Sequence, residues 1–306
     1  MSSLIEQATR RLEQLRQAGV VLPSVTNEKI NSQATNNKFI GTKPFISDTQ
    51  STNIELKPVS FSRKVDLDLD ALAAAGIVSP NAPRSQIADQ YRVIKRPLIS
   101  NAMGKGASII ENGNLIMVTS ALAGEGKSFS AINLAMSIAT ELDNTVMLVD
   151  ADVARPSVLR MLGLPASPGL LDLLVGDVDD LSSVLLKTNI DKLTLLPSGT
   201  PHMRATELLA SDAMSQLIRN IANRYSDRII IFDSPPLLLT TESRVLATHM
   251  GQIVMVVQAE KTLQVDIQHA LASIEACPVK MMVLNQAKNG LQGGYGGYGY
   301  GYGYDQ

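Results

Sequence analysis

The chain contains very little cysteine, and this shortage limits both its chemistry and its compartment. Cys277 is the single cysteine among 306 residues, so an intrachain disulfide and a metal cluster built on cysteines are both excluded. Disulfides are rare where thiols are kept reduced, and a lone cysteine therefore fits a reducing compartment.

Long apolar runs are missing as well. No stretch approaches the roughly 18 consecutive apolar residues that a membrane-spanning helix requires. The first residues, MSSLIEQATRRLEQLRQAG, lack the apolar core of a secretory signal. The sequence therefore predicts a cytoplasmic protein, and any role at a membrane would be exerted through a partner or a surface contact.

The charges are nearly balanced, with 27 Lys and Arg against 29 Asp and Glu. General affinity for nucleic acid requires a basic face, so we expect no nucleic-acid partner. The hydrophobic fraction of 45% and the charged fraction of 18% are those of a globular protein.

The body of the chain, residues 67–289, alternates between two patterns. Short apolar segments predict strands over 115–118, 145–149, 192–196, 228–232, 251–257 and 279–284. Helical patterns lie between them, for example over 206–225 and 263–276. This alternation predicts an α/β fold with a mostly parallel sheet and helices on both faces.

The residues before this body have a different composition. Residues 1–20 carry Leu, Ile and Ala at helical spacing with arginines elsewhere on the wheel, which predicts a helix. The pattern fits a helix that packs back on the domain as well as one that docks a partner. Residues 21–66 are rich in Ser, Thr, Asn and Lys with weak periodicity, and they predict a flexible linker.

The segment around Lys127 has the layout of a phosphate-binding P-loop. A predicted strand, Leu115–Val118, is followed by the loop Ala121–Ser128, which ends in Gly-Lys-Ser, and then by a helical run. Backbone N–H groups of such a loop converge on an anion. Lys127 can reach the β- and γ-phosphates, and Ser128 can offer its hydroxyl to Mg²⁺. Ala121 stands where the pattern usually has its first glycine.

Acidic residues close two of the predicted strands. Asp150 and Asp152 follow the strand 145–149, and Asp233 follows 228–232. In parallel sheets ligands bind outside the carboxyl ends of the strands, so we expect these carboxylates near the P-loop. Asp150 and Asp152 can hold Mg²⁺-bound water or accept a proton from a hydroxyl, and one of them can also cap the next helix. Asp233 has the position of an acid that orients Mg²⁺.

The segment 290–306 consists mainly of glycine and tyrosine. Five tyrosines lie in its last twelve residues, namely Tyr295, Tyr298, Tyr300, Tyr302 and Tyr304. The intervening glycines prevent a packed core, which predicts a disordered tail. A flexible chain of about 12 residues spans roughly 20 Å, and this tail leaves the last predicted strand at the nucleotide edge. Phenolic hydroxyls beside a nucleotide site predict phosphoryl transfer to tyrosine.

A row of charges marks the helix predicted from about Ser85. Asp89, Arg92 and Lys95 follow at intervals of three residues and share one slanting row. Such rows are usually solvated faces. The alternative is a self-complementary contact between copies, in which Asp89 of one chain meets Arg92 or Lys95 of another.

Together these motifs resemble the bacterial tyrosine kinases (BY-kinases), in particular the stand-alone cytoplasmic autokinases of exopolysaccharide clusters with the exosortase (PEP-CTERM) system. The resemblance is carried by the P-loop segment, or Walker A motif (Ala121–Ser128), a second Walker motif (Val146–Pro156) and the Walker B motif (Ile229–Pro236). The charged helix and the tyrosine tail complete it. The usual Glu and last Arg of the family's charged helix are Asp89 and Lys95 here. The Arg that usually follows the second motif's second Asp by two residues is Ala154.

The resemblance implies an ATP-dependent autokinase that phosphorylates its tail in trans within a homo-oligomer such as a ring, and so regulates exopolysaccharide synthesis or export. It assigns catalysis to Lys127, Asp150 and Asp152, and Mg²⁺ to Ser128, Asp150 and Asp233. The oligomer contact would comprise Asp89, Arg92 and Lys95. The nucleotide contacts would come from Ala123, Gly124, Glu125, Gly126, Lys127, Ser128 and Phe129.

The same resemblance implies partners. A membrane-bound polysaccharide co-polymerase would be a separate chain that activates the kinase and brings it to the inner membrane. A tyrosine phosphatase would reverse the modification.

Two alternatives belong to other classes. A partner-stimulated ATPase of the ParA/MinD type shares the fold, but it has a lysine where this chain has Leu122, and it lacks a tyrosine tail. A nucleotide-sensing scaffold without catalysis is the second alternative, and the presence of Lys127 with all three acidic residues argues against it.

Overall fold

The computed structural model describes residues 62–80, 85–224 and 228–288. The predicted N-terminal helix (1–20), nearly all of the predicted linker and the tyrosine tail lie outside these ranges. Within them, no helix combines the length and apolar character needed to cross a bilayer.

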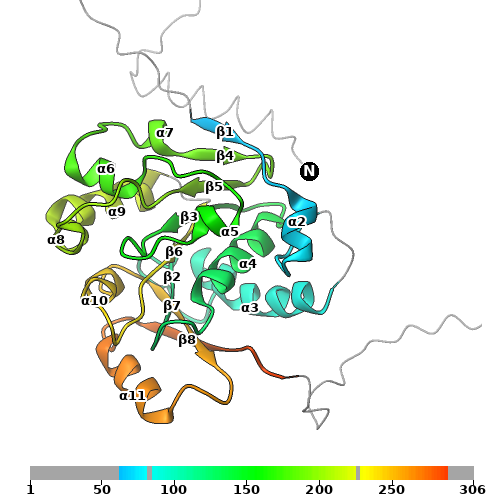
Figure 1. Cartoon of the computed structure of the whole chain (residues 1–306). Coiled ribbons are helices and arrows are strands. Elements are labelled where there is room, and N and C mark those ends of the chain that lie inside the picture. Colours follow the sequence, from blue (N-terminus) through cyan, green and yellow to red (C-terminus); the bar gives the residue numbers. More distant parts are fainter. Residues whose placement is uncertain (1–61, 81–84, 225–227, 289–306) are drawn as a thin grey trace, which may run out of the picture. The chain divides into compact units, whose positions relative to one another are not determined.

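Eight strands of the described residues form one sheet in the order β1-β4-β5-β3-β6-β2-β7-β8 (Figure 1). Neighbouring strands are parallel except for β4 and β5, which are antiparallel, so the predicted, mostly parallel sheet is confirmed. The strands are β1 (Arg63–Val65), β2 (Leu115–Ser120), β3 (Thr145–Asp150), β4 (Leu186–Thr188), β5 (Leu193–Leu196), β6 (Arg228–Asp233), β7 (Gln252–Gln258) and β8 (Val279–Asn285).

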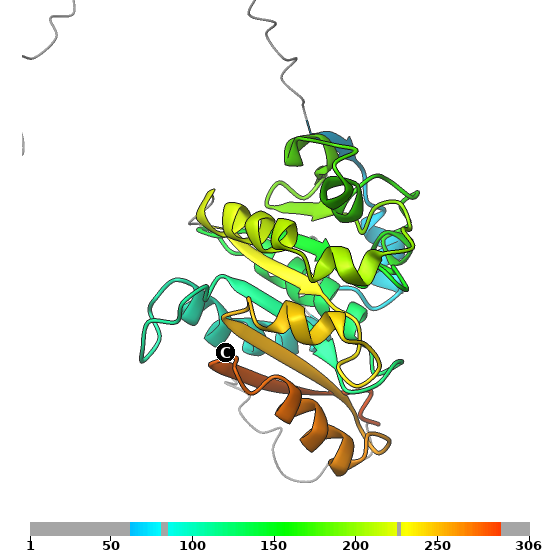
Figure 2. The same ribbon diagram turned by 90° about the vertical axis from the view of Figure 1, so that its left-hand side faces the viewer.

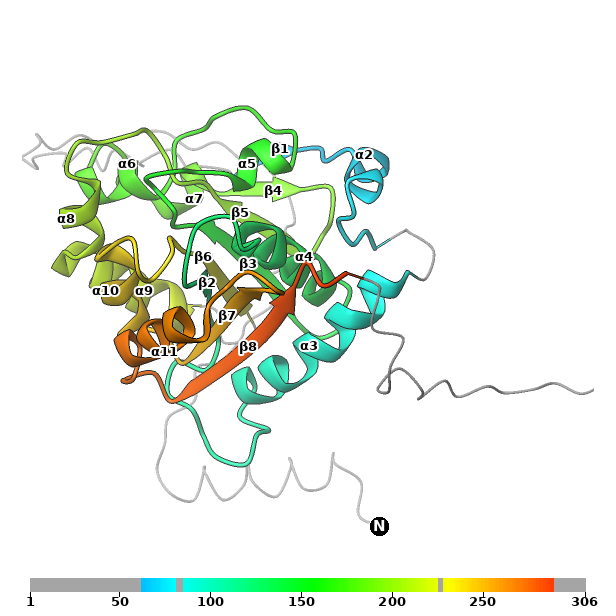
Figure 3. The same cartoon turned by 60° about the horizontal axis from the view of Figure 1, so that its bottom comes forward.

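Helices cover both faces of the sheet. They are α2 (Leu69–Ala74), α3 (Gln86–Ala102), α4 (Lys127–Ala139), α5 (Val158–Met161), α6 (Leu170–Val175), α7 (Leu181–Val184), α8 (Ala205–Leu209), α9 (Asp212–Arg224), α10 (Glu242–Ala247) and α11 (Gln264–Ser273). Figure 2 looks onto the face covered by α8–α11, and Figure 3 shows the edge strand β8 between α11 on one side and α3 on the other.

Two hydrophobic cores lie on the two faces because successive strand residues point in opposite directions. Ile116 and Val118 of β2 join the core beneath α2, α3 and α4. Leu115 and Met117 join the core beneath α9, α10 and α11. Strands buried on both faces explain why their sequences read as continuous apolar runs rather than as an alternating pattern.

The structure differs from the sequence-based expectation at the β1 edge of the sheet and in one helix. Arg63–Val65 fall inside the predicted linker, yet they form β1 beside β4. Strands of three residues carry too little periodicity to be recognised. The helix predicted over 206–225 is two helices, because the Ser211 hydroxyl accepts a hydrogen bond from the Met214 N–H and caps a new start.

A buried carboxylate fastens α6 to the loop that follows β5. Asp172 accepts hydrogen bonds from the backbone N–H groups of Gly169 (2.7 Å) and Thr200 (3.1 Å). Burial alone would raise the pKa of the Asp172 carboxyl, but the hydrogen bonds from Gly169 and Thr200 hold it below its usual value.

We expect Asp172→Ala to lower the free energy of unfolding by about 2 kcal/mol at pH 7, because the buried Gly169 N–H and the part-buried Thr200 N–H lose their acceptor. Because its pKa is lower in the folded state, the Asp172 carboxylate stabilises the protein at pH values above its unfolded-state pKa of about 4. This stabilisation is lost as the pH falls through the lower, folded-state pKa. Urea unfolding at several pH values measures this. The exposed Asp179→Ala is the control, and a difference from wild type that does not shrink as the pH is lowered would contradict the expectation.

Candidate active site

The P-loop turns from the central strand β2 into α4 through two left-handed residues. Gly124 has φ +86° and Gly126 has φ +92°, a region that side chains rarely adopt, so both positions require glycine. Lys127 then opens α4, and Ser128 lies buried in its first turn. This is the strand–loop–helix arrangement predicted for the motif, and it leaves the helix N-terminus available to an anion.

Sheet register brings the strand-end acids together. β3 and β6 are neighbours, and Asp150 and Asp233 are directly opposite each other in their ladder. β6 also pairs with β2, where Asp233 stands opposite Val118, just before the P-loop. The acids that end two strands separated by some 80 residues therefore meet at the carboxyl edge beside the phosphate-binding loop.

The P-loop lysine is held by the second of the paired acids. Lys127 Nζ lies 2.6 Å from Asp152 Oδ2, and both side chains are largely buried. Asp152 Oδ1 accepts a hydrogen bond from the Arg155 N–H at 3.2 Å, while the Arg155 side chain is exposed. The ammonium of Lys127 is thus positioned over the loop by an anion with which a phosphate would compete.

One carboxylate oxygen of Asp150 accepts hydrogen bonds from the backbone, and the other accepts none among the described residues. Its Oδ2 accepts from the backbone N–H groups of Ser157 (3.1 Å) and Val158 (3.0 Å), so it caps the start of α5, which was one of the sequence-based alternatives. In the described part of the chain, its Oδ1 accepts no hydrogen bond. Burial raises the pKa of the Asp150 carboxyl to about 6, against the lowering effect of the Val158 and Ser157 N–H groups.

Asp233 is 0% exposed, and neither of its carboxylate oxygens accepts a hydrogen bond of regular geometry among the described residues, although the Ser128 hydroxyl lies near enough to lower the carboxyl's pKa. Burial raises the pKa of the Asp233 carboxyl to about 7, although the charge of Lys127 acts in the opposite direction. Orphaned carboxylate oxygens deep in a site are costly, and a cation would satisfy them.

This donor set fits Mg²⁺. The described residues contain no cluster of three or more His, Cys, Asp or Glu side chains that would by itself form a metal site. Mg²⁺ usually binds through one or two carboxylates together with substrate phosphates and water, rather than in an all-protein cage. Asp233 with the Ser128 hydroxyl, beside the P-loop, provides such a partial site.

Two cavities adjoin these groups. The first, of about 450 Å³, lies over the P-loop and is lined by Gly124, Lys127, Asp152, Arg155 and Pro236 among others. The second, of about 270 Å³, has Asp150 in its lining and apolar walls that include Pro156, Leu159, Leu164, Ala166 and Pro201. Arg160 lines both cavities, while Asp152 lines the first and Asp150 the second, so the carboxylate pair lies where the two cavities adjoin.

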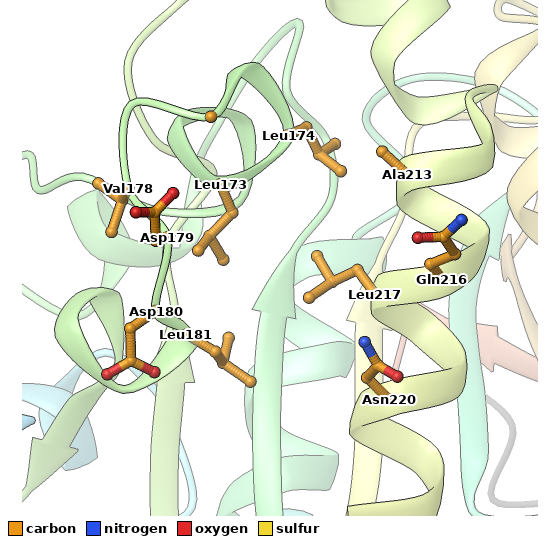
Figure 4. Close-up of a pocket in the computed structure, with 11 residues that line it drawn as sticks. Leu173, Leu174, Val178, Asp179, Asp180, Leu181, Ala213, Gln216, Leu217 and Asn220 are labelled. Atoms are coloured by element: carbon orange, nitrogen blue, oxygen red, sulfur yellow. The ribbon is translucent and has the colours of Figure 1, made fainter.

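A third cavity, of about 440 Å³, lies between α9 and the segment that contains α6 and α7 (Figure 4). Leu173, Leu181 and Leu217 point into it, with Asp179 and Gln216 near its rim. It contains no lysine and no glycine-rich turn at a helix N-terminus, so it lacks the groups that hold a nucleotide phosphate.

The three charged residues of the row on α3 have different environments in the structure. Arg92 forms an exposed ion pair with Asp89 of its own helix. Lys95, in contrast, is 3% exposed and lies 2.8 Å from Glu141 and 3.0 Å from the Thr140 hydroxyl. The prediction of three charges on one solvent-facing contact is therefore wrong for Lys95, because α3 packs on the C-terminal end of α4, where carbonyl groups attract a cation.

Most of the predicted site residues lie around the P-loop. The buried Glu125 side chain accepts a hydrogen bond from Thr262, a residue that sequence reasoning missed. Asn285, at the end of β8, also reaches the loop and was missed. No local pattern marks either residue as part of the site. The five tail tyrosines lie outside the described residues.

The chain is similar in sequence to known proteins. A family model described as an AAA domain matches residues 113–281. Tyrosine-protein kinase YwqD of Bacillus subtilis (strain 168) is 29% identical over 224 residues, which cover 72% of this chain and 90% of that protein. Putative tyrosine-protein kinase EpsB of Ralstonia nicotianae is 32% identical over 168 residues, 55% of this chain but only 22% of its own length.

A solved structure gives the same result for the fold. The crystal structure of the chimerical protein CapA2B2 superposes with a TM-score of 0.57 at 26% identity, covering 72% of this chain and 93% of that one.

Proposed function

Because this chain belongs to the AAA-domain family and is a bacterial protein-tyrosine kinase (BY-kinase), we propose that it transfers the γ-phosphoryl group of ATP to its own C-terminal tyrosines. The observation that carries the proposal is the register of β2, β3 and β6. It supports a single site in which Lys127 and the P-loop face Asp150, Asp152 and Asp233.

The donor side of the reaction is assigned to the P-loop. Its backbone N–H groups and Lys127 hold the phosphates of ATP, and Asp152 orients the lysine. Ser128 and Asp233 would hold Mg²⁺, which would neutralise charge on the transferring phosphoryl group. The resemblance assigned Asp150 to the metal as well, but we assign the one oxygen of Asp150 that accepts no hydrogen bond to the acceptor instead.

The acceptor side is assigned to the cavity of about 270 Å³. Its apolar walls suit a phenol ring, and Asp150, which lines it, has one carboxylate oxygen, Oδ1, without a hydrogen-bond partner among the described residues. In the transfer, the phenolic oxygen bonds the γ-phosphorus, the bond from that phosphorus to the β–γ bridging oxygen breaks, and ADP leaves. Asp150 takes the phenolic proton, a role that suits a carboxyl whose pKa is raised to about 6.

We further propose that the reaction runs in trans between copies of the chain in a homo-oligomer. The exposed Asp89–Arg92 pair supports a contact between copies, since each side chain can exchange its partner with a second chain. The resemblance to exopolysaccharide kinases supports a regulatory role in polysaccharide synthesis or export, at the inner membrane beside a membrane-bound co-polymerase. A tyrosine phosphatase would complete the cycle.

Replacing all five tail tyrosines with Phe is expected to remove autophosphorylation while leaving ATP binding unchanged, because only the acceptor hydroxyls are lost. Mass spectrometry after incubation with Mg-ATP measures phosphate on each peptide, and calorimetry measures ATP affinity. Phosphate on Tyr91 or Tyr225 at the wild-type level would contradict the proposal.

The same variant tests transfer between chains. Mixed with Lys127→Met protein, whose tail is intact, it should phosphorylate that tail. A mixture that stays unphosphorylated would instead place donor and acceptor in one chain.

A further inference from the structure

Side chains from the ends of β7 and β8 brace the outer surface of the P-loop. A loop that directs N–H groups inward at a phosphate leaves carbonyl groups that need donors elsewhere. The Asn285 amide donates to the Glu125 carbonyl at 2.9 Å, and the Gln286 amide donates to the Gly124 carbonyl at 3.1 Å. The approach at β8 is close, since a Cβ on Gly126 would lie 2.1 Å from Asn285 Nδ2.

A buried carboxylate makes the second connection. Glu125 is 2% exposed although it lies within the loop. Its Oε2 accepts from the Leu122 N–H at 2.8 Å, and its Oε1 accepts from the Thr262 hydroxyl. Thr262 Oγ1 in turn accepts from the N–H of Gln258, the last residue of β7, at 3.0 Å. Charge-assisted bonds of this kind are stronger than neutral ones, so the loop is tied firmly to the sheet.

We propose that Glu125 and Thr262, with Asn285, are positioning residues that hold the P-loop ready for the nucleotide phosphates. The inference rests on the nucleotide site proposed above, and it gives the Glu125 side chain a role beside the backbone contact expected of that residue. A loop with glycines at two positions has much backbone freedom, and freedom lost on binding weakens affinity. A loop braced in advance has already lost that freedom, so the brace acts on nucleotide affinity rather than on the chemical step.

Thr262→Val tests the brace, because it keeps the shape of the side chain and removes the hydroxyl. We expect the Kd for ADP and the KM for ATP to rise about tenfold, with kcat within about twofold of wild type, since ground state and transition state lose the same binding. Titration calorimetry of the full chain with ADP measures the Kd without any turnover. Thr262→Ser, which restores the hydroxyl, should return both constants to the wild-type range.

Thr248→Val is the matched control. Thr248 follows the last residue of α10, its hydroxyl donates to the Val245 carbonyl of that helix, and the residue is exposed, so ADP affinity should not change. Thermal unfolding separates positioning from simple stabilisation. A Thr262→Val protein with a lower Tm and an unchanged Kd for ADP would overturn the inference, while a wild-type chain that binds no ADP would instead overturn the proposed function.

A double-mutant cycle shows whether Glu125 and Thr262 act as one unit. We expect Glu125→Gln to weaken ADP binding to a similar extent, and the double variant Glu125→Gln with Thr262→Val to be little weaker than either single one. Independent roles would give a product of the two effects, on the order of a hundredfold, and that outcome would overturn the coupling.

Discussion

Lys127→Met is expected to lower the rate of tail phosphorylation by about 10³-fold or more, the largest effect of any single substitution considered. A positioned cation that stabilises charge in phosphoryl transfer contributes on this scale. Lys127 lies at the start of α4, 2.6 Å from Asp152, over the cavity that would hold the phosphates. Met keeps the length and apolar stem of the side chain but supplies no charge.

The initial rate of phosphate transfer from labelled ATP measures this effect, with mass spectrometry to locate the product. Lys105→Met is the control, because Lys105 is exposed and precedes β2, at the opposite end of that strand from the P-loop. A Lys127→Met protein that still phosphorylates its tail within about tenfold of wild type would remove the P-loop from the mechanism.

Asp233→Asn is expected to change activity and stability in opposite directions. Phosphorylation should fall by about 10²-fold or more, because the proposed Mg²⁺ ligand loses its charge. The nucleotide-free protein should become more stable by about 1 kcal/mol, because the native carboxylate is buried and accepts no hydrogen bond of regular geometry among the described residues. The destabilisation caused by the unpaired Asp233 carboxylate in the ion-free state is relieved when the cation binds.

Thermal and urea unfolding in the absence of Mg²⁺ and nucleotide measure the gain, and the labelled-ATP assay measures the loss. A gain of 1 kcal/mol corresponds to about 2–4 °C in Tm for a domain of this size. The exposed Asp143→Asn removes the same charge elsewhere and should change neither quantity. Lower stability together with retained activity would show that Asp233 supports the fold and not a metal.

Much of the site was predictable because its chemical groups are marked by short, local sequence patterns. The apolar run before the P-loop, the Gly-Lys-Ser turn and the acids after two strands each depend on neighbours in the chain. The rule that ligands bind at the carboxyl ends of parallel strands then predicts that Lys127, Asp150 and Asp233 meet. Glycine at 124 and 126 follows from the left-handed backbone that the turn requires.

Other features depend on contacts between distant segments, and no local pattern carries them. Glu125 and Thr262 are separated by 137 positions in the sequence. Their hydrogen bond becomes visible only in the folded structure, where β7 pairs with β2. In the sequence, Lys95 and Arg92 are both basic residues in the same row of charges. Packing of α3 on α4 nevertheless buries Lys95 and leaves Arg92 exposed.

The sequence by itself determined the α/β architecture and the phosphate-binding loop, because periodicity and turn residues act over a few positions. Only the tertiary structure decided which carboxylate oxygens remain without partners, which charges are buried and what braces the P-loop. These properties depend on sheet register and on helix packing, where a shift of one residue would exchange the buried and exposed sides of a strand.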